Sequence, residues 1–317
     1  MAATRTWRAE RSSDRLDKAL VQAFPELSRA RLKALMDEGS ITLAGQPVRA
    51  SQRVRVGDEV TVSIPDAVAA LPKPEDLALP ILYQDTDVIV VHKPAGMVVH
   101  PSAGHYEGTM VNALLHHATG LSGIGGVLRP GIVHRLDGGT SGVMVVAKHD
   151  TAHHALTTQF AVHSVERRYL AVVHRVIRLD RGTFRSQLAR DPDDRLRIAS
   201  VDDGGRNAVT HWEVKARGDR CTLVECRLET GRTHQVRVHL SEAGHPILGD
   251  RTYGRRDCVP TAALRDLVEA LSHPLLHAYL LAFDHPNGSG RQRFVAPPPD
   301  DFVAVCKRAG LPVPAIT

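Results

Sequence analysis

The stretch Gly131–Lys148 carries the residue types best suited to chemistry, in the sequence GIVHRLDGGTSGVMVVAK. It places one carboxylate, Asp137, in a glycine-rich bend between two apolar runs, with a positive charge just before it and hydroxyls just after it. Glycines in such a bend bring backbone to a place where a bulky side chain would obstruct a ligand. We therefore predict that Asp137 lies at the floor of a cleft and is a catalytic group. The alternative is a purely structural turn aspartate, because Asp-Gly is a common turn dipeptide.

This stretch resembles the HRLD-x-x-TSG segment of the RluA/RluD family of pseudouridine synthases, which isomerise uridine to pseudouridine within structured RNA. Three further segments resemble the same family and follow in its order: Ile81–Ser102, Arg167–Val173 and Leu228–Gly254. Together the resemblance extends from about Ile81 to Pro298. It implies an enzyme that acts on RNA.

The resemblance implies that Asp137 initiates the reaction. Converting uridine to pseudouridine breaks a carbon–nitrogen glycosidic bond, turns the uracil and joins ribose to carbon five of the base. One carboxylate can start this sequence, either as a nucleophile toward ribose or base, or as the base that removes the ribose 2′ hydrogen. Both routes stay open. Since no atom is gained or lost, we expect no redox cofactor, no ATP and no metal, and no Walker or dinucleotide-binding motif is present.

Two further side chains are implied beside Asp137. Arg237, in THQVRVH, corresponds to the family's ion-pair partner, and a sheltered carboxylate needs such a cation to stay ionised. Tyr169, in RRYLAVV, corresponds to the tyrosine that lies against the target base, offering a stacking face and a hydroxyl. Without the resemblance, Arg237 would be an exposed helical arginine, easily confused with Arg232, and Tyr169 a core residue.

Two residues are implied in contacts with the RNA. A uridine in stacked RNA must be flipped out to reach a buried carboxylate. Arg135 resembles the family arginine that contacts the rearranged RNA, and its planar head could stack where the base had been; the alternative is a salt bridge within the bend. Leu276, in HPLLHAYLL, corresponds to an apolar residue that closes the pocket around the base.

Two features depart from the family pattern or compete with it. The family bend often carries Lys-Asp after the aspartate, whereas this chain has Gly138 and Gly139, which we expect to loosen the bend or permit closer approach of RNA. The 18 histidines raise the question of a metal site. His149 and His153 could share a helix face, but no third ligand stands at a recognisable spacing.

Composition limits the class of protein. A chain of 317 residues with 43% hydrophobic and 24% charged residues is typical of a soluble protein of two domains. No apolar run approaches the roughly 20 residues of a membrane span, and the N-terminus lacks a secretory signal pattern, so we expect a cytoplasmic protein. The four cysteines form neither a disulfide framework nor a zinc pattern. The net charge of +5 fits an anionic partner.

Residues 1–64 are predicted to form a small ααβ domain. Apolar residues recur at helical spacing from Arg15 to Phe24, a second helix follows a Ser28 cap and ends at Gly39, and two strand-like stretches come after it. The unit resembles the RNA-binding domain first described in ribosomal protein S-four. Its basic residues then predict a phosphate-tracking face, although a solvated surface is the alternative; they are Arg29, Arg31, Lys33 and Arg53.

Residues 65–79 are rich in alanine and proline and are predicted to be a linker, and residues 80–317 to be the catalytic domain. Strands and helices intermix there without regular βαβ alternation, which favours an α+β fold with a mixed, largely antiparallel sheet. The predicted strands are Val88–Val91, Val143–Val146, Tyr169–Val173, Thr222–Leu228 and Leu275–Phe283. The predicted helices are Thr109–Ala118, Thr151–Val162, Thr233–Glu242 and Thr261–Ala270. By resemblance, the first expected partner is large-subunit ribosomal RNA and the second is tRNA.

Two functions from other classes remain as alternatives. One is a noncatalytic RNA-binding or ribosome-assembly protein that keeps the fold. The other is an N-glycosidase acting on RNA, which would require a second carboxylate to activate water. The sequence shows no obvious carboxylate of that kind beside Asp137.

Overall fold

The computed structural model describes residues 3–24, 27, 29–64, 72–101, 107–117, 131–194, 196–255, 258 and 261–313. It contains two compact units, Met1–Ala70 and Leu71–Thr317. The boundary falls within the segment 65–79 predicted to be a linker. The predicted cap Ser28 lies outside the described residues.

The first unit packs two helices on a four-stranded antiparallel sheet, with strand order β1-β4-β2-β3. Its elements are β1 (Ala3–Arg8), α1 (Leu16–Ala23), α2 (Arg29–Asp37), β2 (Ile41–Leu43), β3 (Gln46–Pro47) and β4 (Glu59–Ile64). The apolar positions that predict the helices supply the core, since Leu16, Leu20, Leu32 and Leu35 are buried together. Strand β1 was not predicted, because it pairs residue for residue with the distant β4.

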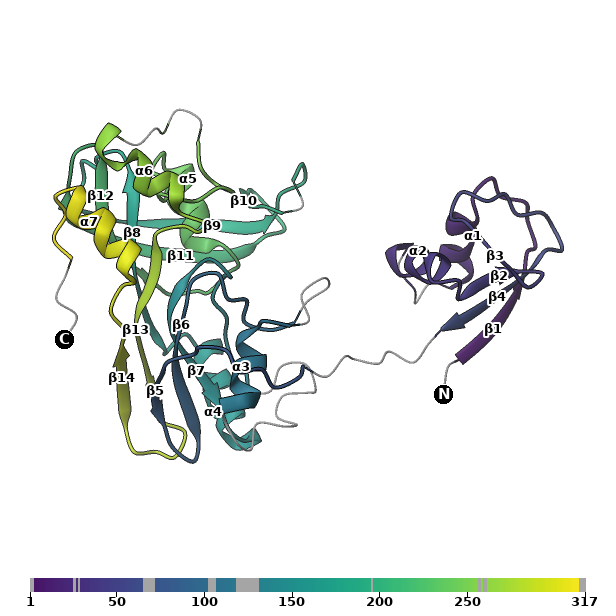
Figure 1. The fold of residues 1–317 in the computed structure, drawn as a ribbon, viewed down its shortest axis with the longest axis horizontal. Coiled ribbons are helices and arrows are strands. Elements are labelled where there is room, and N and C mark those ends of the chain that lie inside the picture. The colour runs from purple at the N-terminus through teal and green to yellow at the C-terminus, as the bar shows by residue number, and fades with distance from the viewer. Residues whose placement is uncertain are drawn as a thin grey trace. The chain divides into compact units, whose positions relative to one another are not determined.

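The second unit is built on a ten-stranded sheet with the order β10-β9-β11-β12-β8-β13-β7-β6-β5, and β14 pairs with β13 (Figure 1). The strands are β5 (Ile81–Gln84), β6 (Val88–Lys93), β7 (Ser141–Ala147), β8 (Glu166–His174), β9 (Arg181–Arg190), β10 (Ile198–Val201), β11 (Arg206–Arg217), β12 (Cys221–Leu228), β13 (Leu276–Asp284) and β14 (Arg291–Val295). All pairings are antiparallel except that of β13 with β7. The predicted α+β class, with a largely antiparallel sheet, is confirmed.

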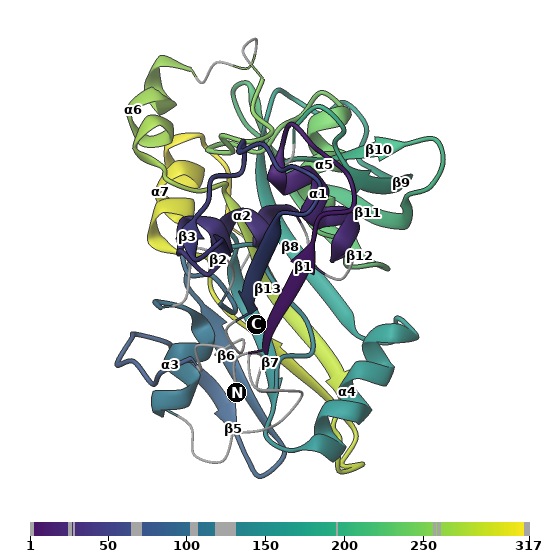
Figure 2. The ribbon, with the colours of Figure 1, turned by 90° about the vertical axis from the view of Figure 1, so that its right-hand side faces the viewer.

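Five helices accompany this sheet: α3 (Met110–His117), α4 (Asp150–Ala161), α5 (Gln235–Glu242), α6 (Ala262–Ala270) and α7 (Asp300–Arg308). Helices α3 and α4 lie on opposite sides of β6 and β7 (Figure 2). Alternate residues of β6 enter different cores, Ile89 with α3 and Val90 with α4. Because both faces are covered, β7 is buried along its whole length.

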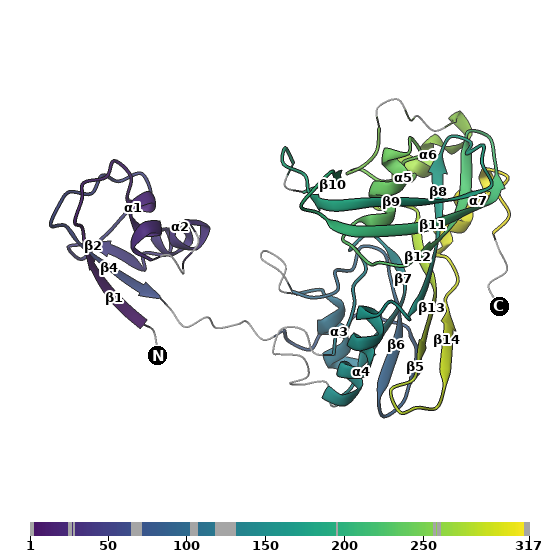
Figure 3. The same cartoon turned by 180° about the vertical axis from the view of Figure 1, so that it is seen from behind.

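Toward the other end of the sheet, strand β9 is covered on one face only. Helix α5 lies beside β9, β10 and β11 (Figure 3), and Phe184 and Trp212 stack on that face. The opposite face of β9 is solvated, since Arg181, Thr183 and Arg185 are exposed. Because exposed polar residues alternate along β9 and β11, neither strand has an apolar run, and the sequence analysis did not predict them. It also did not predict β5, β10 and β14.

Candidate active site

Asp137 lies in a tight turn that leads directly into β7. The backbone N–H of Thr140 donates to the Asp137 carbonyl oxygen at 3.0 Å, and Ile132 forms a bridge to Val146 of β7. At the start of β7, Gly142 has a φ of +137°, and a Cβ there would lie 2.3 Å from the carbonyl oxygen of Ala278. Glycine thus permits the close parallel pairing of β7 with β13, which fixes where the turn begins.

The buried side chain of Lys93 forms hydrogen bonds to the backbone of the Asp137 turn and of the segment after β6. The Lys93 Nζ donates to the carbonyl oxygens of Pro94, Met97 and Gly138 at 2.9, 2.7 and 3.1 Å. Burial lowers the pKa of Lys93 to about 7, while the negative charge of Asp137 acts in the opposite direction. Three carbonyl acceptors match the three N–H groups of an ammonium, so Lys93 ties the Asp137 turn to the end of β6.

The two glycines after Asp137 do not face the ligand space. A Cβ on Gly139 would lie 2.9 Å from Cδ of Pro274, and one on Gly138 would lie 3.6 Å from Cγ2 of Val98. Neither glycine lines the pocket described below. Gly139 therefore lets the turn pack closely against Pro274. The sequence analysis had instead related this glycine to a looser bend or a closer approach of RNA.

Arg237, on α5, lies between two carboxylates. Its Nε and Nη2 donate to Asp250 at 2.7 and 2.9 Å, and its Nη1 donates to Oδ2 of Asp137 at 3.3 Å. Asp250 also accepts the backbone N–H groups of Thr252 and Tyr253. Hydrogen bonding and charge from Asp250, followed by the charge of Asp137, raise the pKa of Arg237 despite its burial. A bidentate pair with Asp250 thus orients the guanidinium edge that meets Asp137.

His234 forms a second contact beside Asp137. Its Nε2 lies 3.9 Å from Oδ2 of Asp137, and its Nδ1 lies 2.8 Å from the Tyr253 hydroxyl. That hydroxyl accepts the backbone N–H of Ile198, so its proton is directed to Nδ1 and the imidazole N–H faces Asp137. Burial lowers the pKa of His234, while the negative charge of Asp137 acts in the opposite direction. This tyrosine also places its ring 4.9 Å from Cζ of Arg237.

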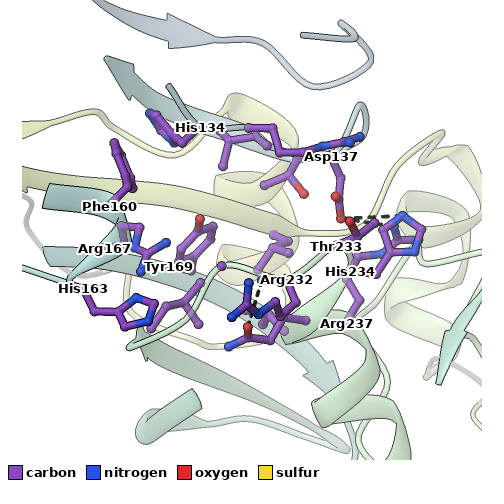
Figure 4. A pocket seen from close by; sticks show the side chains of 18 of the residues that line it. His134, Asp137, Phe160, His163, Arg167, Tyr169, Arg232, Thr233, His234 and Arg237 are labelled. Atoms are coloured by element: carbon purple, nitrogen blue, oxygen red, sulfur yellow. Dashed lines mark hydrogen bonds and ion pairs between the residues drawn. The ribbon is translucent and has the colours of Figure 1, made fainter. Parts of the chain in front are cut away.

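The predicted Tyr169, Leu276 and Arg135 line the same pocket as Asp137 and Arg237. Figure 4 shows Tyr169, Asp137 and Arg237 around this pocket. Tyr169 comes from β8 and is only 8% exposed, and Leu276 opens β13. Burial raises the pKa of Tyr169 to about 12, the charge of Asp137 adds to this, and Arg167 opposes it. Arg135 is exposed at this pocket.

Two other histidines of the matching segments have structural hydrogen bonds. Nε2 of His134 accepts the backbone N–H of Val145 at 3.1 Å, and burial lowers the pKa of His134 to about 3. His239 pairs with the hydroxyls of Thr210 and Ser186 at 2.9 and 3.0 Å, and burial lowers its pKa to about 4. Both imidazoles are neutral and shape the walls around the pocket.

The structure describes the side chains of two of the four basic residues predicted to contact RNA in the first unit. Lys33 is exposed on α2, and Nε of Arg53 lies 3.3 Å from Asp14, with both side chains largely exposed. Arg29 and Arg31 belong to α2, but their side chains lie outside the described part of the structure.

Within the described residues, two groups outside the pocket could hold a metal ion by proximity alone: Asp76, His116 and His117, and Asp85, Asp87 and His285. In the second group, Nε2 of His285 lies 2.8 Å from Asp85, and the Tyr83 hydroxyl donates to the same carboxylate at 3.0 Å. These contacts join the β5–β6 turn to the turn after β13. Neither group touches the Asp137 pocket.

The charge of the pocket restricts its chemistry. Among the described residues that line it, Asp137 is the one carboxylate, and arginines 135, 167, 232 and 237 surround it. Asp250 is outside the lining and has its oxygens occupied by Arg237 and backbone amides. A glycosidase that activates water with a second carboxylate is therefore not favoured. The pocket thus offers one carboxylate in a cationic setting that suits an anionic ligand.

Comparison with known proteins identifies the class further. A family model described as RNA pseudouridylate synthase matches residues 87–242, and the S4 domain model matches residues 14–60. The chain is 48% identical over 297 residues to ribosomal large subunit pseudouridine synthase D of Zymomonas mobilis, covering 92% of this chain and 93% of that protein. This chain belongs to the RNA pseudouridylate synthase family, which converts uridine to pseudouridine, as the sequence resemblance implied.

Other relatives agree. An uncharacterized RNA pseudouridine synthase of Bacillus subtilis, YlyB, is 44% identical over 293 residues, covering 92% of this chain and 93% of that protein. The solved structure of human RNA pseudouridylate synthase domain containing 4 superposes with a TM-score of 0.58 at 27% identity, covering 74% of this chain and 95% of that chain. No helix in the described residues is both long and apolar enough to cross a membrane.

Sequence reasoning missed three residues that the structure brings to the site: Lys93, Asp250 and Tyr253. All three lie inside the segments that carry the family resemblance. A lysine that ends an apolar strand before proline, as in VVHKP, is a signal for Lys93. No spacing rule points to Asp250, since its contact with Arg237 depends on how the chain returns after α5.

Proposed function

We propose that this chain isomerises specific uridines of large-subunit ribosomal RNA in the cytoplasm, with tRNA as the second candidate substrate. The observation that carries the proposal is the pocket in which Nη1 of Arg237 meets the Asp137 carboxylate at 3.3 Å. The choice of RNA is supported by the printed name of the Zymomonas mobilis relative and by the N-terminal domain match.

In this proposal Asp137 begins the reaction. Its side chain is 16% exposed, so a flipped nucleotide can reach it while bulk water is largely excluded. Arg237 and the N–H of His234 offset the cost of sheltering the negative charge. The geometry is compatible with attack on the sugar and with removal of the 2′ hydrogen.

Tyr169 and Leu276 hold the uracil ring. With its pKa raised to about 12, Tyr169 is a phenol at neutral pH, so its hydroxyl donates a hydrogen bond and is a poor base. After ribose is released from N1 and joined to carbon five, the Asp137 carboxylate is free again and takes the proton from carbon five. N1 of the uracil takes up a proton, so no atom is gained or lost. Leu276 covers the base from the β13 side.

Basic residues bring the RNA to the pocket. Arg135 is exposed two residues before Asp137 and fills the space from which the uridine is flipped. In the first unit Arg29, Arg31, Lys33 and Arg53 contact phosphates, in keeping with the net charge of +5.

A pseudouridine map tests the proposal. Total RNA from cells with and without the gene is treated with carbodiimide and read by primer extension. We expect a stop in large-subunit ribosomal RNA that is lost on deletion and restored by the wild type but not by Asp137→Asn. A stop lost only from tRNA would reassign the substrate, and restoration by Asp137→Asn would refute the role of Asp137. No lost stop would favour a noncatalytic RNA-binding protein.

A further inference from the structure

Arg167 is a buried arginine of β8 without an acidic partner among the described residues. Only 7% of it is exposed, its Nη2 donates to the Glu229 carbonyl oxygen at 2.9 Å, and its Nε has no hydrogen-bond partner. The next residue, Arg168, is the contrast, because it pairs with Glu166 at 2.7 Å and with Glu225 at 3.1 Å. Arg168 does not line the Asp137 pocket, whereas Arg167 does.

An unpaired buried cation is unfavourable unless something compensates it. The Cζ of Arg167 lies 5.7 Å from the Phe160 ring centroid, which supplies a modest cation–π contact. The chain also makes room for the guanidinium, since a Cβ on Gly231 would lie 2.5 Å from Nη1 of Arg167. The Phe160 ring and the space at Gly231 hold the Arg167 guanidinium at the pocket wall. Its main counter-charge is left to come from a ligand.

A second arginine of the pocket lies near enough to Arg167 for the two positive charges to interact. Burial lowers the pKa of Arg167, and the charge of Arg232 lowers it further. Within the described residues, the hydrogen bond of the Arg232 side chain is that of its Nε to the Asn207 carbonyl oxygen at 3.0 Å. Figure 4 shows Arg167 and Phe160 on one side of Tyr169, and Asp137 with Arg237 on the other. Arg167 and Tyr169 share a face of β8 two residues apart, a spacing of about 7 Å. The end of the pocket opposite the catalytic carboxylate is therefore cationic.

We propose that Arg167, with Arg232, binds a phosphodiester group of the RNA that flanks the target uridine. The inference rests on the proposed function, because it takes the uracil to lie at Tyr169. A guanidinium fork matches two phosphate oxygens, and a buried one binds them without competition from water. Arg167 thereby holds the backbone of the flipped nucleotide while Asp137 acts on its sugar.

The test combines an enzyme change with a matched change in the RNA. The substrate is a stem-loop containing the uridine located by the pseudouridine map, with a neutral methylphosphonate replacing the phosphate on its 5′ or its 3′ side. For the wild type we expect one of these replacements to lower kcat/KM about 10- to 100-fold, the range of one or two charged hydrogen bonds. Arg167→Gln should show the same loss on unmodified RNA and almost no further loss with that methylphosphonate.

Two further variants separate recognition from folding. Gly231→Ala keeps every charge but pushes the Arg167 head aside, and it should reproduce part of the loss and of the coupling. Arg168→Gln removes an arginine that does not line the pocket, and it should remain fully sensitive to the methylphosphonate. Thermal unfolding of each variant checks that the fold is retained.

A binding measurement adds a readout that a structural role would not change. For Asp137→Asn bound to the unmodified stem-loop, adding Arg167→Gln should lower the slope of log Kd against log salt by about 0.7 to 0.9, the value for one phosphate contact. An unchanged slope, or equal methylphosphonate losses in wild type and Arg167→Gln, would overturn the inference. Loss of activity in Arg167→Gln without coupling at either flank would instead assign Arg167 to the base. A wild type inactive on every RNA would refute the proposed function itself.

Discussion

Asp250→Asn tests whether the hydrogen bonds of Asp250 to Arg237 position the Arg237–Asp137 pair that we propose to be catalytic. The wild-type carboxylate accepts four hydrogen bonds, two from Arg237 and two from the backbone amides of Thr252 and Tyr253. An asparagine has one oxygen and one NH₂ group in the same place, so at least one N–H of Arg237 would face another donor. The guanidinium must then rotate away, and Asp137 is the nearest carboxylate that it can approach.

The expected loss of stability follows from these contacts. Asp250 and Arg237 are both buried, and breaking a buried charged pair costs about 3 to 5 kcal/mol, while retention of one charged hydrogen bond would reduce this to about 2 kcal/mol. In a unit of this size each kcal/mol lowers Tm by roughly 2–4 °C. We therefore expect Tm to fall by about 4 °C or more, while Asp266→Asn on exposed α6, the matched control, should leave it unchanged.

Activity separates positioning from stability alone. Release of tritium from carbon five of labelled uridine in RNA, assayed well below Tm, reports the isomerisation. For Asp250→Asn we expect kcat to fall about 10- to 100-fold with KM nearly unchanged, because a misplaced Arg237 affects a step after binding. A variant with lower Tm but kcat within about two-fold of the wild type would refute the reasoning, since Asp250 would then be needed only for folding.

Three other outcomes are expected. Lys93→Met leaves three carbonyl oxygens without their N–H donor and should lower the unfolding free energy by about 3 kcal/mol or more, measured with urea. Burial lowers the pKa of His277 to about 4. The stability that its neutral form gives the folded chain is therefore complete above pH 6.5 and is lost as pH falls toward 4. In His277→Gln, the slope of the unfolding free energy against pH should be shallower near pH 5 by about 1.4 kcal/mol per pH unit. Deleting residues 1–70 should weaken RNA binding and flatten its salt dependence, and an unchanged slope would mean that this unit binds something other than phosphate.

The helices and buried strands were predictable because their patterns are local. In α1, apolar positions at helical spacing are the ones that meet the core, and in β7 a continuous apolar run follows from coverage on both faces. Strand β9 lacks such a pattern because its outer face is solvated. It is held as a strand by its pairing with β11, which lies later in the chain. Strand β1 likewise depends on β4, far along the chain.

The site divides in the same way. Asp137, Tyr169, Arg237, Arg135 and Leu276 were named from motif resemblance, and the structure brings all five to one pocket. The hydrogen bonds of Asp250 to Arg237 could not be inferred from the sequence, because they form only when the chain after α5 turns back toward that helix. Lys93 was overlooked because a lysine after an apolar run is typical of the solvated end of a strand, and the VVHKP context alone does not show that its side chain is buried under the Asp137 turn.

The charge balance of the pocket explains how a carboxylate can face a polyanion. The described residues of its lining hold four arginines and one aspartate, a formal excess of three positive charges. Asp250 lies outside the lining and offsets Arg237, so the proposal assigns the attraction of RNA to Arg135, Arg167 and Arg232. In that proposal, different arginines attract the RNA backbone and pair with Asp137. It follows that neutralising Arg232 should affect RNA affinity and its salt dependence, whereas changes at Asp250 should affect kcat.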